Sequence, residues 1–183
     1  MDVRALPDED LVSYIRAENS EAYAEVVSRY QDALVRYSSF MIKNEFTAHE
    51  LVCDAFVNAY RDLNSYSPRL KFSSYLYRTM HHTLSEFLKK QRTSESFDES
   101  ESFEEELRDL TLVEGEERDP EIVSHVLRYA RHIPLLYRDP LVLHFIELKS
   151  YNDISDILQI PVSSVESRIV QGKNMLRKKH GKK

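Results

Sequence analysis

The chain has 183 residues, 42% of them hydrophobic, and a formal net charge of −6 at pH 7. This length fits one ordinary domain or two small ones with packed cores. Only three glycines occur, and no glycine-rich phosphate-binding pattern is present. The sequence has no run of 18 apolar residues, the length that a membrane-spanning helix needs. The lone Cys53 cannot form an internal disulfide. We therefore expect a globular, cytoplasmic protein.

Charged residues are distributed unevenly along the chain. Residues 1–92 hold 12 Lys and Arg against 13 Asp and Glu, residues 93–120 hold 2 against 12, and residues 121–183 hold 11 against 6. The three segments therefore carry −1, −10 and +5, so the acidic middle segment accounts for the negative total. A basic C-terminal third is typical of a chain that contacts nucleic acid.

The first 92 residues have a helical period from Asp8 onward. We expect helices within residues 20–43, 47–63 and 72–92. In the middle one, Thr47 and Glu50 have the spacing of a capping box at the helix start. Its apolar residues recur at steps of three and four and predict a buried stripe: Leu51, Val52, Ala55, Phe56, Ala59, Tyr60 and Leu63.

Residues 93–120 interrupt this pattern with Ser, Asp and Glu. Such a composition buries too little apolar surface to fold alone, so we interpret it as an acidic flexible linker with a short helix around Phe103 to Leu110. The predicted organisation is all-α, with two small helical domains at residues 1–92 and 121–183 joined by this linker.

The second block resumes the helical period after the linker. We expect helices over residues 121–133 and 134–148, the latter broken near Pro140. Two shorter helices then flank a turn at residues 159–161, and Ser150 with Asp153 marks the start of the first one. This layout is typical of a helix-turn-helix, although two packed helices with a tight turn also occur in proteins that bind no DNA.

The second helix of this pair separates apolar from polar residues. Val162, Val165, Ile169, Gly172 and Leu176 fall on one side. Short hydroxyl, amide and Arg side chains suit hydrogen bonds to phosphates and base edges in a major groove. Such side chains are predicted to point outward at Ser164, Ser167, Arg168, Gln171 and Asn174.

Three blocks, in order, resemble the extracytoplasmic-function (ECF) sigma factors of bacterial RNA polymerase. "AHELVCDAFVNAYRDLNSY" is similar to the family's region 2.2, "FSSYLYRTMHHTLSEFLKK" to regions 2.3 and 2.4, and "IPLLYRDPLVLHFIELKSYNDISDILQIPVSSVESRI" to region 4. The resemblance implies a region-2 domain and a region-4 domain, core RNA polymerase and promoter DNA as partners, and neither a cofactor nor enzymatic activity. Further partners that it suggests are an anti-sigma factor and a DNA-bound recruiting protein.

The resemblance also assigns contact residues in the first domain. The helix similar to region 2.2 implies polymerase docking through Glu50, Cys53 and Asp54, with Cys53 where the family usually has Gln. The turn before residue 72 and the helix after it imply recognition and opening of the −10 element. The implied −10 contacts are Arg69, Lys71, Tyr75, Arg78 and His82, the last standing where Asn is common.

In the second domain the resemblance implies contacts with the −35 element. The matching residues are Ser163, Ser164, Glu166, Ser167, Arg168, Gln171 and Lys173. The family commonly has a basic residue at the positions of Glu166 and Gln171. Glu166 also has a structural interpretation, since Ser163 as N-cap would form a capping box with it. The two departures suggest either an unusual −35 preference or reliance on another DNA-bound protein.

Simpler interpretations remain open for several of these residues. Glu50 and Asp54 also fit a solvated helix face, and Tyr75 and Tyr77 also fit the core. His49, Cys53 and Asp54 lack the further ligands of a metal site, so no metal is predicted. No nucleophile, base and orienting acid recur at a recognisable spacing, which disfavours a hydrolase. The alternative function is a sigma-like module that binds a regulator without initiating transcription.

Overall fold

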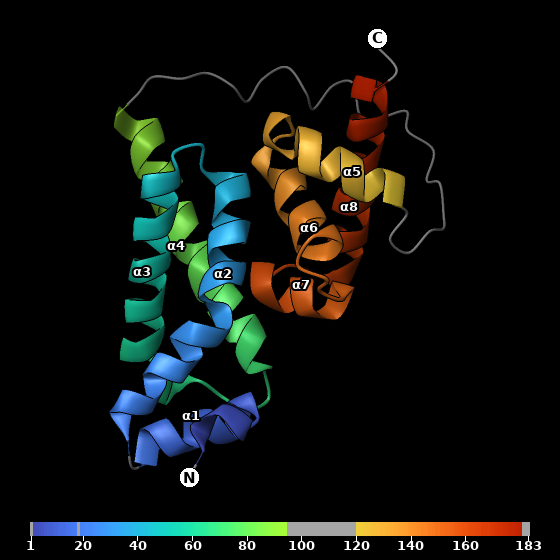
Figure 1. The fold of residues 1–183 in the computed structure, drawn as a ribbon. Helices are drawn as coiled ribbons and strands as arrows, with labels where there is room; N and C mark the ends of the chain where they lie inside the picture. Colours follow the sequence, from blue (N-terminus) through green and yellow to red (C-terminus); the bar gives the residue numbers. More distant parts are fainter. Residues whose placement is uncertain (1, 18, 95–119, 181–183) are drawn as a thin grey trace. The chain divides into compact units, whose positions relative to one another are not determined.

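The structure is a computed structural model that describes residues 2–17, 19–94 and 120–180. These residues form helices and connecting turns, with no strand among them, so the predicted all-α fold is confirmed. The chain divides into two compact units. The division falls within α4, after Ser85. We call η1 to α4 the N-terminal unit and α5 to α8 the C-terminal unit (Figure 1). The predicted linker and its short helix at Phe103 to Leu110 lie outside the described residues, apart from the ends of the 93–120 segment.

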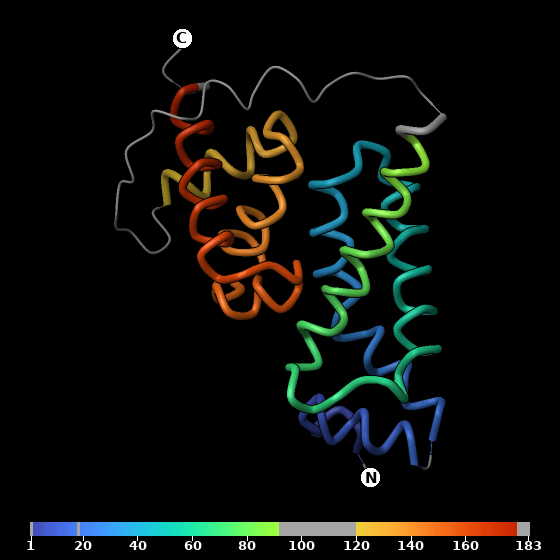
Figure 2. The backbone as a smooth tube through the Cα atoms, turned by 180° about the vertical axis from the view of Figure 1, so that it is seen from behind, coloured from blue at the N-terminus to red at the C-terminus, as the bar shows by residue number. Residues whose placement is uncertain are grey.

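The N-terminal unit consists of α-helices joined by short 3-10 turns. In both views α2, α3 and α4 run alongside one another (Figures 1 and 2). The elements are η1 (Val3–Ala5), α1 (Asp8–Ala17), η2 (Ser20–Ala22), α2 (Tyr23–Met41), α3 (Glu45–Arg61), η3 (Leu63–Ser65) and α4 (Phe72–Ser94).

Helix α3 begins earlier than predicted. Asn44 is its N-cap and accepts a hydrogen bond from the backbone N–H of Thr47 at 3.1 Å. The predicted capping box of Thr47 and Glu50 is therefore wrong, because both residues already lie inside the helix. Asn satisfies the first free N–H groups as well as Thr does. The start of α3 was thus set by a cap that lay three residues before the predicted one.

Aromatic side chains join α4 to α2. The rings of Tyr37 and Tyr77 meet edge to face with centroids 5.6 Å apart, and both residues are almost completely buried. Tyr30 contacts Phe72 in the same way at 6.3 Å. The predicted apolar stripe of α3 is buried except at Tyr60, which is 44% exposed. Its ring lies against that of Tyr23 at the edge of the core instead of within it.

The C-terminal unit is built from four α-helices and one 3-10 turn within the described residues. Its elements are α5 (Pro120–Tyr129), η5 (Ala130–His132), α6 (Leu135–Phe145), α7 (Tyr151–Leu158) and α8 (Val162–His180). Helix α6 passes through Pro140 without ending, so the predicted break there is wrong. Proline removes the bond to the carbonyl four residues earlier. That carbonyl belongs to Leu136 in the first turn of α6, and the helix continues past Pro140 to Phe145.

Helices α6 and α8 approach closely at Gly172. A Cβ atom at this position would lie 2.6 Å from Cδ1 of Leu141, a fully buried residue of α6. The missing side chain therefore lets the two helices pack at short range. Val165 and Ile169 are buried on the same side of α8. The predicted inward face of this helix is confirmed at these three positions.

The predicted helix-turn-helix is present as α7 and α8. Ser150 and Asp153 form a complete capping box at the start of α7, as the sequence indicated. Gln159 ends α7 in the left-handed conformation, with φ of 55°. The chain then turns through Pro161, and α8 begins at Val162.

None of the helices in the described ranges combines the length and apolar character that a membrane span requires.

Candidate polymerase and nucleic-acid interfaces

Helix α3 presents the three residues predicted to bind polymerase. Glu50, Cys53 and Asp54 are all exposed, since the buried stripe occupies the opposite side of the helix. Two large apolar residues, Phe46 and Val57, are exposed beside them, by 72% and 54%. The spacing of these residues, three to four along the helix, places them on one face.

Phe46 and Val57 were missed in the sequence. They lie outside the heptad-like stripe of α3, and an apolar residue outside such a stripe is the signal that could have revealed them. The exposed face of α3 therefore combines two apolar side chains with acidic ones.

The five residues predicted for the −10 element follow one another along one edge of the N-terminal unit. Arg69 and Lys71 are exposed in the segment between η3 and α4. Tyr75, Arg78 and His82 continue at steps of three and four along α4, which places them on one face of the helix. Arg78 is half-buried and His82 is exposed. Helical spacing thus puts Tyr75, Arg78 and His82 on one face of α4, and Arg69 and Lys71 are exposed in the turn before it.

Tyr75 also has a structural role. Its hydroxyl donates a hydrogen bond to the carbonyl of Ala59 at 2.9 Å, and its ring packs with those of Tyr66 and Phe72. Burial raises the pKa of Tyr75 to about 12. Its ring is half-buried, so only part of it can stack on a base. Tyr77 is 2% exposed, which confirms that it belongs to the core.

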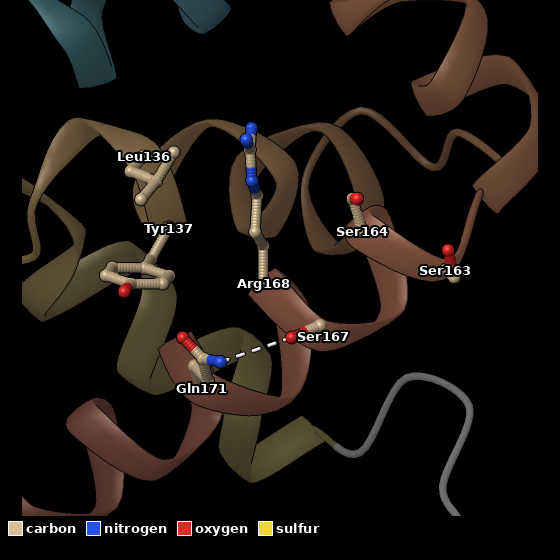
Figure 3. A pocket seen from close by; sticks show the side chains of 7 residues that line it. All are labelled: Leu136, Tyr137, Ser163, Ser164, Ser167, Arg168 and Gln171. Atoms are coloured by element: carbon tan, nitrogen blue, oxygen red, sulfur yellow. Dashed lines mark hydrogen bonds between the residues drawn. The ribbon is translucent and has the colours of Figure 1, made fainter. Parts of the chain in front are cut away.

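The polar face of α8 borders a shallow hollow of about 300 Å³ against α6 (Figure 3). Leu136 and Tyr137 of α6 form one wall, and neither was predicted. In the view of Figure 3 the Arg168 side chain stands out from α8 toward Leu136. The Gln171 amide donates a hydrogen bond to the Ser167 hydroxyl oxygen at 3.1 Å. The α8 residues that line the hollow are Ser163, Ser164, Ser167, Arg168 and Gln171.

The start of α8 excludes a capping box at Ser163 and Glu166. The carbonyl of Pro161 accepts hydrogen bonds from the N–H groups of Ser164 and Val165, at 2.9 and 3.2 Å. Pro161 therefore occupies the cap position, and Ser163 is already the second helical residue. The capping interpretation of Glu166 is wrong. Its side chain is exposed and has no hydrogen bond or ion pair with any described residue.

Two residues farther along α8 are less accessible than expected. Lys173 is only 9% exposed, unlike the other predicted −35 residues. Asn174, expected to face outward, has a buried side-chain nitrogen without a hydrogen-bond partner. Helix α5 packs against α8 and gives the helix a second buried side, which a single-stripe interpretation of α8 did not include. Among the residues predicted to read DNA, the accessible ones therefore lie in the first three turns of α8.

The described residues hold no group of three or more His, Cys, Asp or Glu side chains that could bind a metal ion. His49, Cys53 and Asp54 share α3 but do not form such a group.

Comparison with known proteins agrees with the two-unit organisation. Residues 26–94 match the family model for Sigma-70 region 2, and residues 126–176 match the one for Sigma-70 region 4. The ECF RNA polymerase sigma factor SigW of Bacillus subtilis is 27% identical over 91% of this chain and 93% of its own length. The ECF RNA polymerase sigma-E factor of Haemophilus influenzae is 29% identical over 95% of each chain.

Two solved structures share the fold. CnrH, solved in complex with the cytosolic domain of CnrY, superposes with a TM-score of 0.67 at 22% identity and covers 95% of this chain and 97% of its own. The sigma factor RpoE of Bartonella quintana, solved with the anti-sigma factor NepR, gives a TM-score of 0.65 at 15% identity. That match covers 87% of this chain and 97% of the RpoE chain.

Proposed function

The chain belongs to the ECF sigma factors of bacterial RNA polymerase, and from this membership we propose that it binds core polymerase and directs promoter recognition, DNA opening and transcription initiation. The proposal assigns one task to each of three surfaces, and it assigns no catalytic step to the chain itself. The observation that carries it is the exposed face of α3, which has no evident role within the fold.

The face of α3 is proposed to dock on the polymerase. Glu50 and Asp54 supply negative charge, and Phe46 and Val57 supply apolar area that is buried on binding. Such a combination gives orientation through charge and affinity through burial. Cys53 lies between them as a small, weakly polar group. It cannot replace the hydrogen bonds of the Gln that is common there, so the apolar pair is expected to contribute more than usual.

The track from Arg69 to His82 is proposed to hold the opened −10 element. Single-stranded DNA is bound by cationic side chains along its backbone and by aromatic faces under its bases. Arg69, Lys71 and Arg78 provide the charge. Tyr75 provides the exposed part of one ring, and His82 faces solvent where it can contact a base.

Helix α8 is proposed to read the −35 element from its first three turns. In a helix-turn-helix the N-terminal residues of the second helix contact base edges. Uncharged side chains that can contact base edges line the hollow at Ser163, Ser164, Ser167 and Gln171. Arg168 is the cationic residue among the α8 residues that line it. Lys173 can join only if its side chain leaves its buried position.

Glu166 gives this helix an unusual preference. An exposed carboxylate accepts hydrogen bonds but repels phosphates, and the N4 amino group of cytosine is its usual partner in a major groove. We expect cytosine to be favoured opposite Glu166. We also expect weak binding of the −35 element, aided by another DNA-bound protein, because Glu166 and Gln171 do not contribute cationic contacts.

Run-off transcription with core polymerase and a library of promoters tests the proposal. We expect transcripts that require both the chain and a defined −10 sequence. The double change Phe46→Ala and Val57→Ala should weaken polymerase binding at least tenfold, while the exposed Leu127→Ala in α5 serves as the control. Absence of polymerase binding by the unchanged chain would contradict the proposed function.

A second candidate is a sigma-like module that binds an anti-sigma factor or another regulator without initiating transcription. Two observations favour it: RpoE was solved with an anti-sigma factor and CnrH with the cytosolic domain of CnrY, and Glu166 reduces the positive charge of α8. The same transcription assay separates the two. Polymerase binding without any transcript, with or without a DNA-bound activator, would favour this second candidate.

A further inference from the structure

Arg16 of α1 reaches the segment that precedes the −10 track. Its Nε donates to the carbonyl of Leu63 at 3.0 Å, and Nη2 donates to the carbonyl of Tyr66 at 2.7 Å. Nη2 also contacts the Leu63 carbonyl. These partners lie 47 and 50 residues away in the sequence. One guanidinium thus bonds to two backbone carbonyls, those of Leu63 and Tyr66, in the connection between α3 and α4.

Tyr66 links Arg16 to the residues at the start of α4. Its ring lies 5.5 Å from the Arg16 guanidinium carbon, and its hydroxyl donates to the carbonyl of Leu70 at 2.8 Å. The ring also packs against Phe72 and Tyr75 at 5.3 and 5.2 Å. Tyr66 is 5% exposed, so its position is fixed by these contacts.

The contacts enclose the segment 67–71, which carries Arg69 and Lys71. The Leu70 N–H donates to the carbonyl of Ser67 at 3.1 Å, forming a turn that exposes the two cations. Arg16 bonds directly to Tyr66, which precedes this turn. Tyr66 in turn bonds to Leu70, so Arg16 is connected to both sides of the turn. A residue outside the predicted contact set therefore determines where these cations stand.

We propose that Arg16 is a positioning residue for promoter opening. The inference rests on the proposed function, because it assumes that segment 67–71 meets opened DNA. Arg16 acts through the backbone of residues 63–66, and its planar fork of donors suits two carbonyls at once. A lysine at this position would keep the charge but could not reproduce the paired geometry.

The test compares two templates with the full chain and core polymerase. One is duplex promoter DNA, and the other carries a mismatched, pre-opened −10 region. We expect Arg16→Ala and Arg16→Lys to lower run-off transcription on the duplex at least tenfold. On the pre-opened template the loss should be clearly smaller, because melting is no longer required and only the strand contacts of Arg69 and Lys71 are weakened. Tyr66→Phe, which removes only the bond to Leu70, should give a smaller defect of the same kind.

The controls separate positioning from charge and from folding. Arg4→Ala removes an exposed arginine elsewhere in the N-terminal unit and should leave both templates unaffected. Normal activity of Arg16→Lys on the duplex would overturn the proposal, because charge alone would then suffice. Equal losses on both templates would overturn it as well. If the unchanged chain transcribed neither template, the proposed function itself would fail.

Discussion

The two units hold their loops in different ways. In the N-terminal unit, Arg16 and Arg29 bond to backbone carbonyls that lie 23 to 50 residues away. In the C-terminal unit, Arg138 bonds to the carbonyls of Arg131 and Ile133, only seven and five residues away. The first unit thus depends on long-range contacts of single side chains, whereas the second closes its turn locally.

This difference bears on function because the candidate DNA contacts of the N-terminal unit include residues on a turn, whereas those of the C-terminal unit lie on one helix. The N-terminal cations Arg69 and Lys71 stand on a turn, so a remote change can displace them. The C-terminal contacts stand on one continuous helix, so only local changes should affect them. The two sets also differ in charge, since the exposed start of α8 combines Arg168 with Glu166. Among the assigned contacts, we therefore expect Arg69 and Lys71 to contribute more electrostatic DNA affinity than the start of α8.

Replacing Arg29 should have the largest effect on stability. Its guanidinium donates to the carbonyls of Val3, Arg4 and Leu6 and pairs with Asp8 and Glu25 at 2.9 Å. Arg29→Ala leaves several acceptors unpaired and should lower the free energy of unfolding by about 2–3 kcal/mol. Urea unfolding of the full chain, followed by circular dichroism, measures the loss.

The matched change in the C-terminal unit is Arg138→Ala. Its carbonyl partners lie in a local turn, so we expect a loss of about 1 kcal/mol. An equal or larger loss for Arg138→Ala than for Arg29→Ala would contradict the proposed difference between long-range and local support.

Salt dependence should distinguish the two DNA-binding sets. Each cationic contact adds about 0.7 to the slope of log K against log salt for single strands and about 0.9 for duplex DNA. Replacing Arg69 and Lys71 together by Ala should reduce the slope for an opened −10 template by about 1.4. Arg168→Ala should reduce it for a −35 duplex by about 0.9. Filter binding of the polymerase complex between 50 and 300 mM salt measures both slopes. An unchanged slope after replacement of Arg69 and Lys71 would refute their assignment to the −10 element.

Leu148→Gly should stabilise the C-terminal unit. Leu148 has φ of 56° and is 57% exposed, after the end of α6. A left-handed conformation costs an ordinary residue about 1–2 kcal/mol, and glycine avoids that cost but loses more chain entropy on folding. A net gain of about 0.5–1 kcal/mol in urea unfolding is expected. Leu148→Ala is the control, because it keeps the strain and should give no gain.

The sequence was sufficient for the fold class, for the α3 stripe apart from Tyr60 and for one buried side of α8, because helical periodicity reports burial directly. It failed where local signals competed. Thr47 and Ser163 each resembled a cap, yet Asn44 and Pro161 lie at the true starts. Pro140 resembled a helix end, yet tertiary packing of α6 outweighed the one hydrogen bond that it removes.

The site was predictable only in part. Residues carried by a regular face, such as Glu50 and Asp54, could be placed by spacing alone. Lys173 could not, since its burial depends on which neighbouring helices cover it. Arg16 was invisible for a similar reason. No local pattern reveals a side chain whose partners lie about 50 residues away.

Alkaline pH should weaken the N-terminal unit in particular. Burial raises the pKa values of Tyr23, Tyr30 and Tyr66 and raises that of Tyr75 to about 12, and all four residues belong to this unit. A folded-state pKa above the unfolded value near 10 means that folding favours the neutral phenol. The corresponding stability is complete below about pH 10 and declines as the pH rises above it, until each phenol reaches its own folded-state pKa, about 12 for Tyr75. Urea midpoints at several pH values measure this decline.

Tyr75→Phe isolates one member of the set. The variant loses the hydrogen bond to Ala59 and should be less stable at neutral pH by about 1 kcal/mol. Between pH 10 and 12 its stability should fall less steeply than that of the unchanged chain, because one titrating phenol is gone. A decline of the same steepness would show that Tyr75 ionises in the folded chain as readily as in the unfolded one, and would place the alkaline sensitivity on the other three tyrosines.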